Sequence, residues 1–335
     1  MTQYKSVYLK RGKEESLKRF HPWVFSGAIA KMDESIEDGD TVNVYTSEDK
    51  FIAVGHYQIG SIAVRVLSFE ERSIDKNFWE ERLSEALKMR LAIGIADNYE
   101  NNTYRLVHGE GDSLPGLVID CYGKTAVMQA HSVGMHINRT DIAEALVKVM
   151  NGRIENVFYK SETTLPYKAD LGQENGFIIG GCTDNTAVEN GLKFHVDWLK
   201  GQKTGFFLDQ KYNRLAMQRL IKGLTRGMQE TPLRVLDCFT HMGTFALNCG
   251  YAGASDVLGL DISEFAVEQA RENAKLNHLE KTVHFKEANV LDELPKLAEA
   301  GEQFDVVILD PPAFTKSREA TKNAIKGYRE INRKG

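Results

Sequence analysis

Short apolar runs alternate with segments of helical periodicity between residues 235 and 309, and this alternation restricts the possible folds more than any other feature of the chain. Each predicted strand has four residues, a length typical of a strand that is buried on both faces. Strands joined through helices lie parallel in one sheet, with helices on both faces. We therefore predict a doubly wound α/β domain over residues 191–335. Its predicted strands are 235–238, 257–260, 283–286 and 306–309, and its predicted helices are 244–251 and 264–276.

The preceding sequence shows two other patterns. Residues 1–70 contain short alternating runs separated by turn residues, which indicates a small β-rich module. Residues 71–190 mix both periods and indicate a small α+β middle domain. Three domains also fit the length of 335 residues. The predicted strands here are 42–45, 51–56, 62–67, 117–120, 125–130 and 156–160, and the predicted helices are 77–95 and 139–150.

The charge balance limits how the protein could bind a polyanion. The chain has 42 Lys and Arg against 47 Asp and Glu, a net charge of −5, so no global positive field draws it onto nucleic acid or anionic lipid. The first twenty residues nevertheless carry six cations and two acids. A local polyanion site and a merely solvated basic face both fit this arm. Its candidate phosphate ligands are Lys10, Arg11, Lys18 and Arg19.

The cysteines and residues 1–10 indicate the cellular compartment of the protein. The four cysteines form no Cys-x-x-Cys pair, so neither a disulfide framework nor a zinc cage is predicted, and no metal is expected. Polar residues interrupt residues 1–10 at every second or third place, which differs from the apolar core of a signal peptide. We expect a cytoplasmic protein that makes no contact with a membrane.

Two acids follow neighbouring strands of the predicted sheet. Asp237 ends the first strand, and Asp261 ends the second one. Ligands of open α/β sheets bind at these carboxyl ends, where an acid can accept both hydroxyls of a ribose. The loop is not a dinucleotide-binding G-x-G-x-x-G, because Phe239 and His241 stand where glycines would and only Gly243 remains. Strand-end and helix caps are the alternative roles, and nucleoside binding is the favoured one.

The run FDVVILDPPAF, residues 304–314, is the most discriminating motif. A hydrophobic strand presents Asp310 at its tip, and Pro311-Pro312 forms a stiff loop without amide donors. Such a tip can hold a flat base. The alternative is a loop that only ends a strand. Asp in place of Asn at the head of this tip makes methylation of an exocyclic amine the less favoured chemistry.

Several separated stretches resemble one family, the class I S-adenosylmethionine (SAM)-dependent methyltransferases of the ribosomal RNA large subunit methyltransferase I type. Its members form 5-methylcytosine in 23S rRNA. HPWVFSGAI, at residues 21–29, resembles the start of the family's PUA domain, an RNA-binding β-barrel. Residues 105–122 resemble the signature of its middle domain. KTGFFLDQKYNR, at residues 203–214, resembles the segment that packs over the cofactor before a Rossmann-like catalytic sheet.

The resemblance assigns roles residue by residue. It implies that Asp261 holds the ribose of SAM, that Ile262 packs on adenine, and that Asn289 accepts a bond from the adenine amine. It also implies that Asp310 and Pro311 contact the cofactor, that Asp310 is the catalytic residue that bonds the polar edge of the target cytosine, and that the basic arm binds 23S rRNA. Further cofactor neighbours are Asp237, Phe239, Thr240 and Gly243 at the methionine end and Thr204, Phe207 and Gln210 in the covering segment.

Methylation of cytosine C5 needs a thiolate that adds to C6, and none of the four cysteines is well placed for this step. The family's cysteine follows a later βα unit, so we expect it beyond residue 335, in a catalytic domain that stops here after its fourth strand and the following helix. Two alternatives stay open, a SAM-dependent enzyme for another base such as guanine and a non-catalytic RNA-binding homologue. The sequence also leaves a homodimer open.

Overall fold

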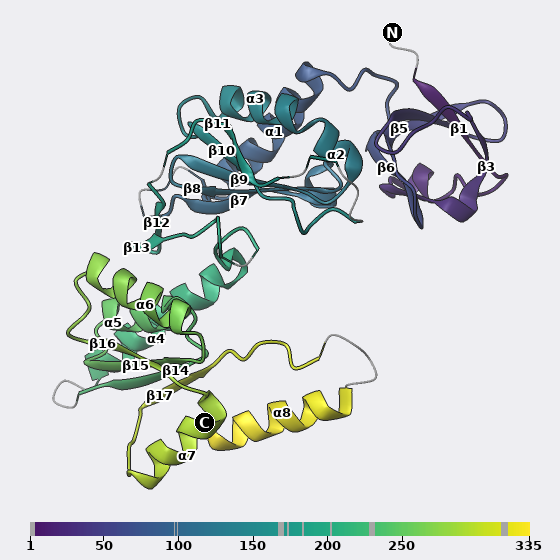
Figure 1. The fold of residues 1–335 in the computed structure, drawn as a ribbon. Helices are drawn as coiled ribbons and strands as arrows, with labels where there is room; N and C mark the ends of the chain where they lie inside the picture. The colour runs from purple at the N-terminus through teal and green to yellow at the C-terminus, as the bar shows by residue number, and fades with distance from the viewer. Residues whose placement is uncertain are drawn as a thin grey trace. The chain divides into compact units, whose positions relative to one another are not determined.

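The protein divides into two compact units, which Figure 1 shows as ribbons in a computed structural model. The first unit comprises Met1–Thr186 and Val196–Phe206, and the second comprises Ala187–His195 and Phe207–Gly335. Among the residues described, no helix combines the length and the apolar character that a membrane crossing requires. The described residues are 4–96, 98, 100–166, 171–172, 174–182, 184–201, 203–227, 232–315 and 321–335.

Six strands at the start of the first unit form a mixed sheet in the order β2-β6-β5-β4-β1-β3. They curve around a common apolar core (Figure 1). The predicted β-rich module is confirmed. Its first strand lies within the basic arm, and Val7 and Leu9 of this strand are fully buried. The strands are β1 (Lys5–Leu9), β2 (Trp23–Phe25), β3 (Ile29–Met32), β4 (Thr41–Tyr45), β5 (Phe51–Tyr57) and β6 (Ile62–Ser68).

A five-stranded sheet with the order β11-β10-β9-β8-β7 forms the rest of the first unit. Its long helix α1 (Lys76–Ala92) begins at Asp75, whose side chain accepts a hydrogen bond from the Phe78 amide at 3.0 Å. The helix ends three residues before the predicted end, and the left-handed Gly94 follows it. The other elements are β7 (Thr103–His108), β8 (Leu117–Tyr122), β9 (Thr125–Ala130), α2 (Val133–Ile137), α3 (Arg139–Met150), β10 (Asn156–Tyr159) and β11 (Gly176–Ile179).

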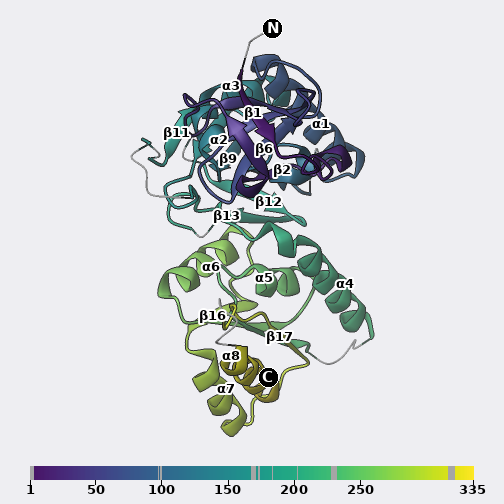
Figure 2. The ribbon, with the colours of Figure 1, turned by 90° about the vertical axis from the view of Figure 1, so that its right-hand side faces the viewer.

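The second unit contains a parallel sheet with the order β16-β15-β14-β17, which confirms the predicted doubly wound architecture. Helices α4, α5 and α6 cover one face of this sheet, and α7 and α8 cover the other (Figures 1 and 2). A hairpin of β12 (Thr186–Glu189) and β13 (Leu192–His195) precedes it. The strands are β14 (Arg234–Cys238), β15 (Asp256–Asp261), β16 (Val283–Glu287) and β17 (Val306–Leu309). The helices are α4 (Lys211–Gly227), α5 (Thr244–Tyr251), α6 (Glu264–Leu276), α7 (Val290–Glu299) and α8 (Thr321–Lys334).

The strand order fixes where a ligand can bind. From β14 the chain adds β15 and then β16 on one side, and it returns to add β17 on the other side. The switch point of the sheet therefore lies between β14 and β17. Open α/β sheets bind their ligands at the switch point, outside the carboxyl ends of the strands. Asp237 pairs in register with Ile308, so β14 and β17 end at nearly the same level.

Candidate cofactor site at the carboxyl edge of the parallel sheet

Three acids meet at this edge because the strands that carry them are parallel. Asp237 lies on β14, Asp261 is the last residue of β15, and Asp310 directly follows β17. All three were predicted at strand tips, and the parallel sheet brings those tips to one side. Within the described residues, none of the three forms an ion pair with Lys, Arg or His. The edge therefore gathers negative charge around the switch point.

Asp237 is buried, with 1% of its surface exposed. Its Oδ2 accepts hydrogen bonds from the Thr240 hydroxyl at 2.5 Å and from the Ala246 amide at 3.0 Å. Burial raises the pKa of Asp237 to about 7. The two hydrogen bonds lower this pKa, and the negative charges of Asp310 and Asp261 raise it further. A cation placed beside Asp237 would favour its ionised form.

The loop after β14 is tightly wound. Phe239, His241 and Gly243 all have positive φ angles, of 64°, 52° and 81°, and the first two are strained there because they carry a Cβ. The Thr240 amide donates to the Leu260 carbonyl at 2.9 Å, which ties the loop to β15. A Cβ on Gly243 would lie 2.6 Å from the Phe285 ring, so only glycine fits. Strain of this kind concentrates at functional sites.

Asp261 links the two loops at this edge. Its Oδ2 accepts from the His241 amide at 2.8 Å, and its Oδ1 accepts from the Ser263 amide at 2.9 Å. Each carboxylate oxygen has a further lone pair with which it can accept a hydroxyl. Two apolar side chains near Asp261 are open to solvent, Ile262 with 69% and Phe265 with 49% of its surface exposed. A carboxylate beside exposed apolar side chains suits a ribose that carries a flat base.

The loop after β17 is held by helix α8. The ring of Phe314 packs edge-on against Tyr328, with 4.7 Å between the ring centroids. Asp310 itself stays open to solvent. Local desolvation raises its pKa, Asp209 adds to the shift, and Arg214 opposes it. Asp310 is therefore an exposed carboxyl group whose pKa is raised and whose oxygens can contact a ligand.

A buried ion pair supports the segment that faces the loop. Arg214 on α4 donates to Glu189 on β12 at 2.6 and 2.9 Å, and its Nη2 also donates to the Phe207 carbonyl at 2.9 Å. The Phe207 ring lies edge-on to His241, at 5.2 Å between centroids. Phe207 thus contacts the same loop as Asp261. Gln210 follows it and accepts from Asn213 at 2.6 Å.

The residues at this edge fit SAM in their chemistry. Three carboxylates without a paired cation favour a ligand that carries positive charge, as the sulfonium and ammonium groups of SAM do. Asp261 and the exposed Ile262 and Phe265 would receive its nucleoside end. Asp237 and the wound loop would receive its methionine end.

Comparisons with known proteins agree with this arrangement. The S-adenosylmethionine-dependent methyltransferase family matches residues 163–334, and a PUA-like domain family matches residues 7–69. The ribosomal RNA large subunit methyltransferase I of Erwinia tasmaniensis is 34% identical over 97% of this chain and 80% of its own length. Its counterpart in Vibrio parahaemolyticus is 36% identical over 98% of this chain and 81% of its own length.

The chain belongs to the ribosomal RNA large subunit methyltransferase I family. It is a SAM-dependent methyltransferase with an N-terminal PUA-like domain, as the sequence analysis predicted. A structure described as a SAM-dependent methyltransferase from Streptococcus mutans has the same fold, with a TM-score of 0.75 and 20% identity over 98% of this chain and 82% of that one. A second structure, of a methyltransferase in complex with SAH, gives a TM-score of 0.76 with the same identity and coverage.

Two predicted cofactor residues have other partners in this methyltransferase. Thr204 is buried in the first unit, where its hydroxyl donates to Asp120 at 2.6 Å and accepts from Tyr122 at 2.8 Å. These bonds make it part of that unit's interior, and we leave it out of the site. Asn289 caps helix α7, and its side-chain oxygen accepts from the Leu291 amide at 3.1 Å. It is exposed just after β16, so its second lone pair stays available to a ligand.

The residues that support the covering segment were not predicted from the sequence. Arg214 and Glu189 are 1% and 0% exposed, and their pairing joins α4 to the hairpin. One signal was present, because Arg214 is the last residue of the matched run 203–214. Glu189 had no signal, since an acid between two short strands is ordinary in sequence. Asp209, near Asp310, lies in the same matched run and had the same signal as Arg214.

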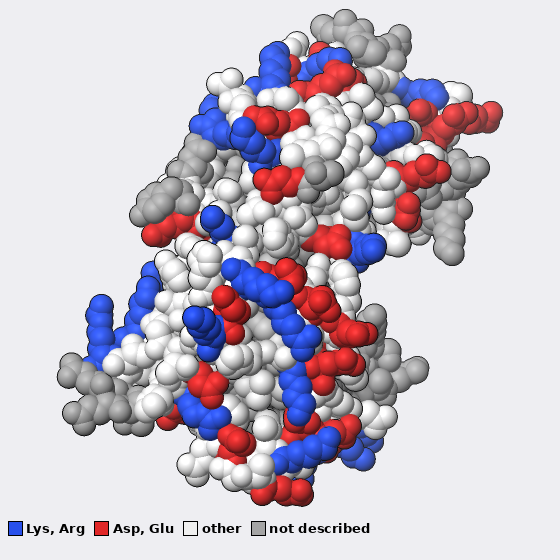
Figure 3. Space-filling view, turned by 60° about the vertical axis from the view of Figure 1, so that its left-hand side comes forward, with Lys and Arg blue, Asp and Glu red and all other residues white. Residues whose placement is uncertain are grey.

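The four predicted RNA ligands are all exposed in the PUA-like module. Lys10 donates to the Gly27 carbonyl at 2.9 Å, Lys18 pairs with Glu15 at 2.7 Å, and Arg19 donates to the Glu15 carbonyl at 3.2 Å. The face drawn in Figure 3 intersperses blue and red side chains, which agrees with a chain that has no global positive field.

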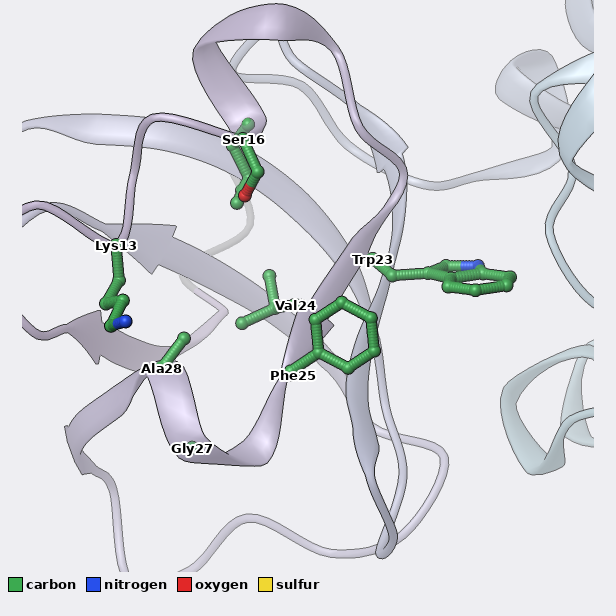
Figure 4. A pocket seen from close by; sticks show the side chains of 8 residues that line it. Lys13, Ser16, Trp23, Val24, Phe25, Gly27 and Ala28 are labelled. Carbon is green, nitrogen blue, oxygen red and sulfur yellow. The ribbon is translucent and has the colours of Figure 1, made fainter.

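A pocket opens beside these cations. It has a volume of about 340 Å³ and is lined by Lys13, Ser16, Leu17, Trp23, Val24, Phe25, Gly27 and Ala28. Figure 4 shows the Phe25 ring and the Lys13 ammonium on either side of Val24. Half of the Phe25 surface is exposed, and its ring lies edge-on to Trp23. Cations beside exposed aromatic rings are typical of surfaces that bind unpaired nucleotides.

Proposed function

We propose that this chain transfers a methyl group from SAM to carbon 5 of a cytosine in 23S rRNA. The observation that carries the proposal is the position of Asp310-Pro311-Pro312 directly after β17, the strand that pairs with the strand of Asp237, at the switch point of the sheet. A base held at this tip would lie at the same sheet edge as the methyl donor. The printed names of the relatives in Erwinia and Vibrio support a large-subunit rRNA substrate.

Each residue of the site has its own role in this proposal. Asp261 would accept the ribose hydroxyls, and Ile262 would pack on the adenine. Asp237 would balance the positive charge at the methionine end, where SAM supplies an electrophilic methyl group. Asp310 would bond the polar edge of the cytosine, and the two prolines keep amide donors away from this edge. Phe207 would exclude water from the loop that it packs against.

Carbon 5 of cytosine becomes nucleophilic when a thiolate adds to C6. C5 then takes the methyl group and loses its proton to a base, and the thiolate leaves. Burial raises the pKa of Cys238 and of Cys121 to about 12, and that of Cys249 is raised as well, so these three stay protonated at neutral pH. Cys182 is exposed, but it belongs to the first unit. The proposal therefore includes a nucleophilic cysteine from outside residues 1–335.

Lys10, Arg11, Lys18 and Arg19 would hold the RNA through its phosphates in the PUA-like module. Their exposure and the pocket beside them support this role. Ribosome assembly would place the protein in the cytoplasm.

Nucleoside mass spectrometry of 23S rRNA tests the proposal. A strain that lacks the gene should lose one 5-methylcytosine, and a copy of the gene should restore it. Loss of a different methylated base would favour the alternative acceptor, such as guanine. An unchanged set of modifications would contradict methyl transfer to this RNA.

A further inference from the structure

Helix α8 carries a row of exposed cations. Lys322, Lys326, Arg329 and Arg333 follow one another at steps of four, three and four residues, so they share one face of the helix. All four are exposed, and none of them pairs with a carboxylate of the described chain. We call these four residues the α8 cation row.

The opposite face of α8 fixes the row to the base-holding tip. Ile331 is fully buried in the core that contains Leu236 and Cys238 of β14. Tyr328 packs against Phe314, and a Cβ on Gly327 would lie 3.2 Å from the same ring. Phe314 stands only four residues after Asp310. The helix is thus docked on the loop that carries Asp310, and the row projects from the side that the core does not use.

Helix stability does not account for the row. Lys322 lies in the first turn, where the helix dipole disfavours a cation, and only the cations of the last turn match the dipole. Cations spaced by three and four residues also repel one another along one face. The 14 residues of α8 carry a charge of +4, whereas the rest of the chain carries −9. A bound polyanion would relieve the repulsion within the helix.

We propose that the α8 cation row binds the phosphates of the RNA strand that flanks the target base, and so presents this base to Asp310. The proposal rests on the RNA substrate proposed above, and it adds a second phosphate-binding surface, in the catalytic unit. Two of its members are arginines, whose planar guanidinium groups match phosphate oxygens in pairs. The N-terminal cations belong to the other unit, so the α8 cation row is a separate surface.

The test compares variants of residues 1–335 in binding an unmodified 23S rRNA transcript across a range of salt concentrations. The variant Lys322→Gln, Lys326→Gln, Arg329→Gln, Arg333→Gln should bind at least tenfold more weakly at low salt. Its plot of log affinity against log salt should be flatter by about 0.7 per lost phosphate contact. Its affinity for SAM in calorimetry should equal that of the wild type, which shows that the unit is folded.

Two matched controls complete the test. Lys322→Arg, Lys326→Arg, Arg329→Lys, Arg333→Lys keeps every charge and should keep the salt slope. Gln at the exposed Lys222, Lys275, Lys281 and Lys296 removes as much charge elsewhere on the same unit and should leave the slope near that of the wild type. A wild-type slope in the row variant, or an equal loss in the second control, would overturn the row proposal alone. A wild type that does not bind the transcript would overturn the proposed RNA substrate, and the row proposal with it.

Discussion

The buried carboxyl group of Asp237 lowers the stability of the folded state at neutral pH. A buried carboxyl group at pKa about 7 is half ionised at neutral pH, with only a hydroxyl and an amide to stabilise its charge. The folded pKa lies above the value of 3.8 that an exposed Asp has. This group therefore stabilises the folded state most below pH 4, and its contribution is lost as the pH rises toward 7.

This shift predicts opposite effects of pH on folding and on cofactor binding. Because the charged ligand favours the ionised carboxylate, the affinity for SAM should rise about tenfold from pH 6 to pH 8. Asp237→Asn should abolish this dependence, lower the affinity at pH 8 and raise the melting temperature at pH 8 but not at pH 4. Calorimetric titration and thermal melts at both ends of the range measure these effects. If Asp237→Asn showed the same pH dependence of SAM affinity as the wild type, this dependence would come from titration of the ligand and not of Asp237.

Asp261 offers a second test at the scale of one residue. A hydrogen bond to a charged group contributes about 1.5–3 kcal/mol, so Asp261→Ala should weaken SAM binding tenfold or more. The same carboxylate holds the amides of His241 and Ser263, and its removal also loosens the loop. Asp261→Asn keeps an acceptor for one amide and should lose less affinity. Equal affinities of wild type and Asp261→Ala in calorimetry would exclude this residue from the cofactor site.

At the scale of elements, the sequence predicted what depends on local periodicity. The bounds of α3, α5, α6 and β17 agree with the predicted ranges residue for residue, because apolar spacing and capping residues are features of the local sequence. Helix α4 was not predicted, since its interior includes Gly223 and its buried side chains include Lys211, Arg214 and Gln218. Strands β12 and β13 are too short to show a period, and they depend on their pairing with each other.

The site was predictable to the same extent. Strand tips could be read from sequence, which located Asp237, Asp261 and Asp310. The support of Phe207 by Arg214 could not, because it depends on a contact between residues that only tertiary packing brings together. For the same reason Thr204, which lies in the matched covering run, was assigned to the cofactor although its hydroxyl bonds within the first unit.

The loop between β14 and α5 gives a prediction at this scale. An alanine at position 243 would adopt a left-handed conformation at a cost of about 1–2 kcal/mol and would also clash with Phe285. Gly243→Ala should therefore lower the free energy of unfolding by more than this strain alone and should abolish SAM binding. Adding Phe285→Leu should recover part of the stability but little of the binding. Denaturant unfolding and calorimetry separate the two effects, and an unchanged stability of Gly243→Ala would refute the close packing at this loop.

The N-terminal module gives another element-scale prediction. Gln at Lys10, Arg11, Lys18 and Arg19 should lower the affinity for 23S rRNA and flatten its salt dependence by about 0.7–0.9 per lost phosphate contact. Lys18 is already paired with Glu15, so it should contribute least of the four. Filter binding at several salt concentrations measures this slope. A slope equal to that of the wild type would show that these cations face solvent and do not contact the RNA phosphates.

For the whole molecule, an acidic chain that binds RNA through local basic surfaces gains selectivity. A net charge of −5 repels phosphates in general, and only an RNA that reaches the cation surfaces overcomes this repulsion. Each unit carries its own surface of this kind under the two proposals. Binding to the whole chain should therefore exceed what either surface gives alone, because the second contact is made within the same complex.

The last prediction is that residues 1–335 bind SAM and RNA but do not methylate cytosine. Under the proposed function, the acids of the donor site, Asp237, Asp261 and Asp310, lie on or directly after strands of the second unit, so we expect residues 1–335 to bind SAM. Methyl transfer to C5 needs a thiolate, and the pKa values of Cys238 and Cys249 are raised far above neutrality by burial. Loss of a covalent nucleophile removes the two-step route and costs several orders of magnitude in rate. The measurement is transfer of a radiolabelled methyl group to unmodified 23S rRNA, with the cognate relative from Vibrio parahaemolyticus as the positive control. Comparable rates from both proteins would direct attention back to Cys238, and Cys238→Ser would then have to abolish the activity.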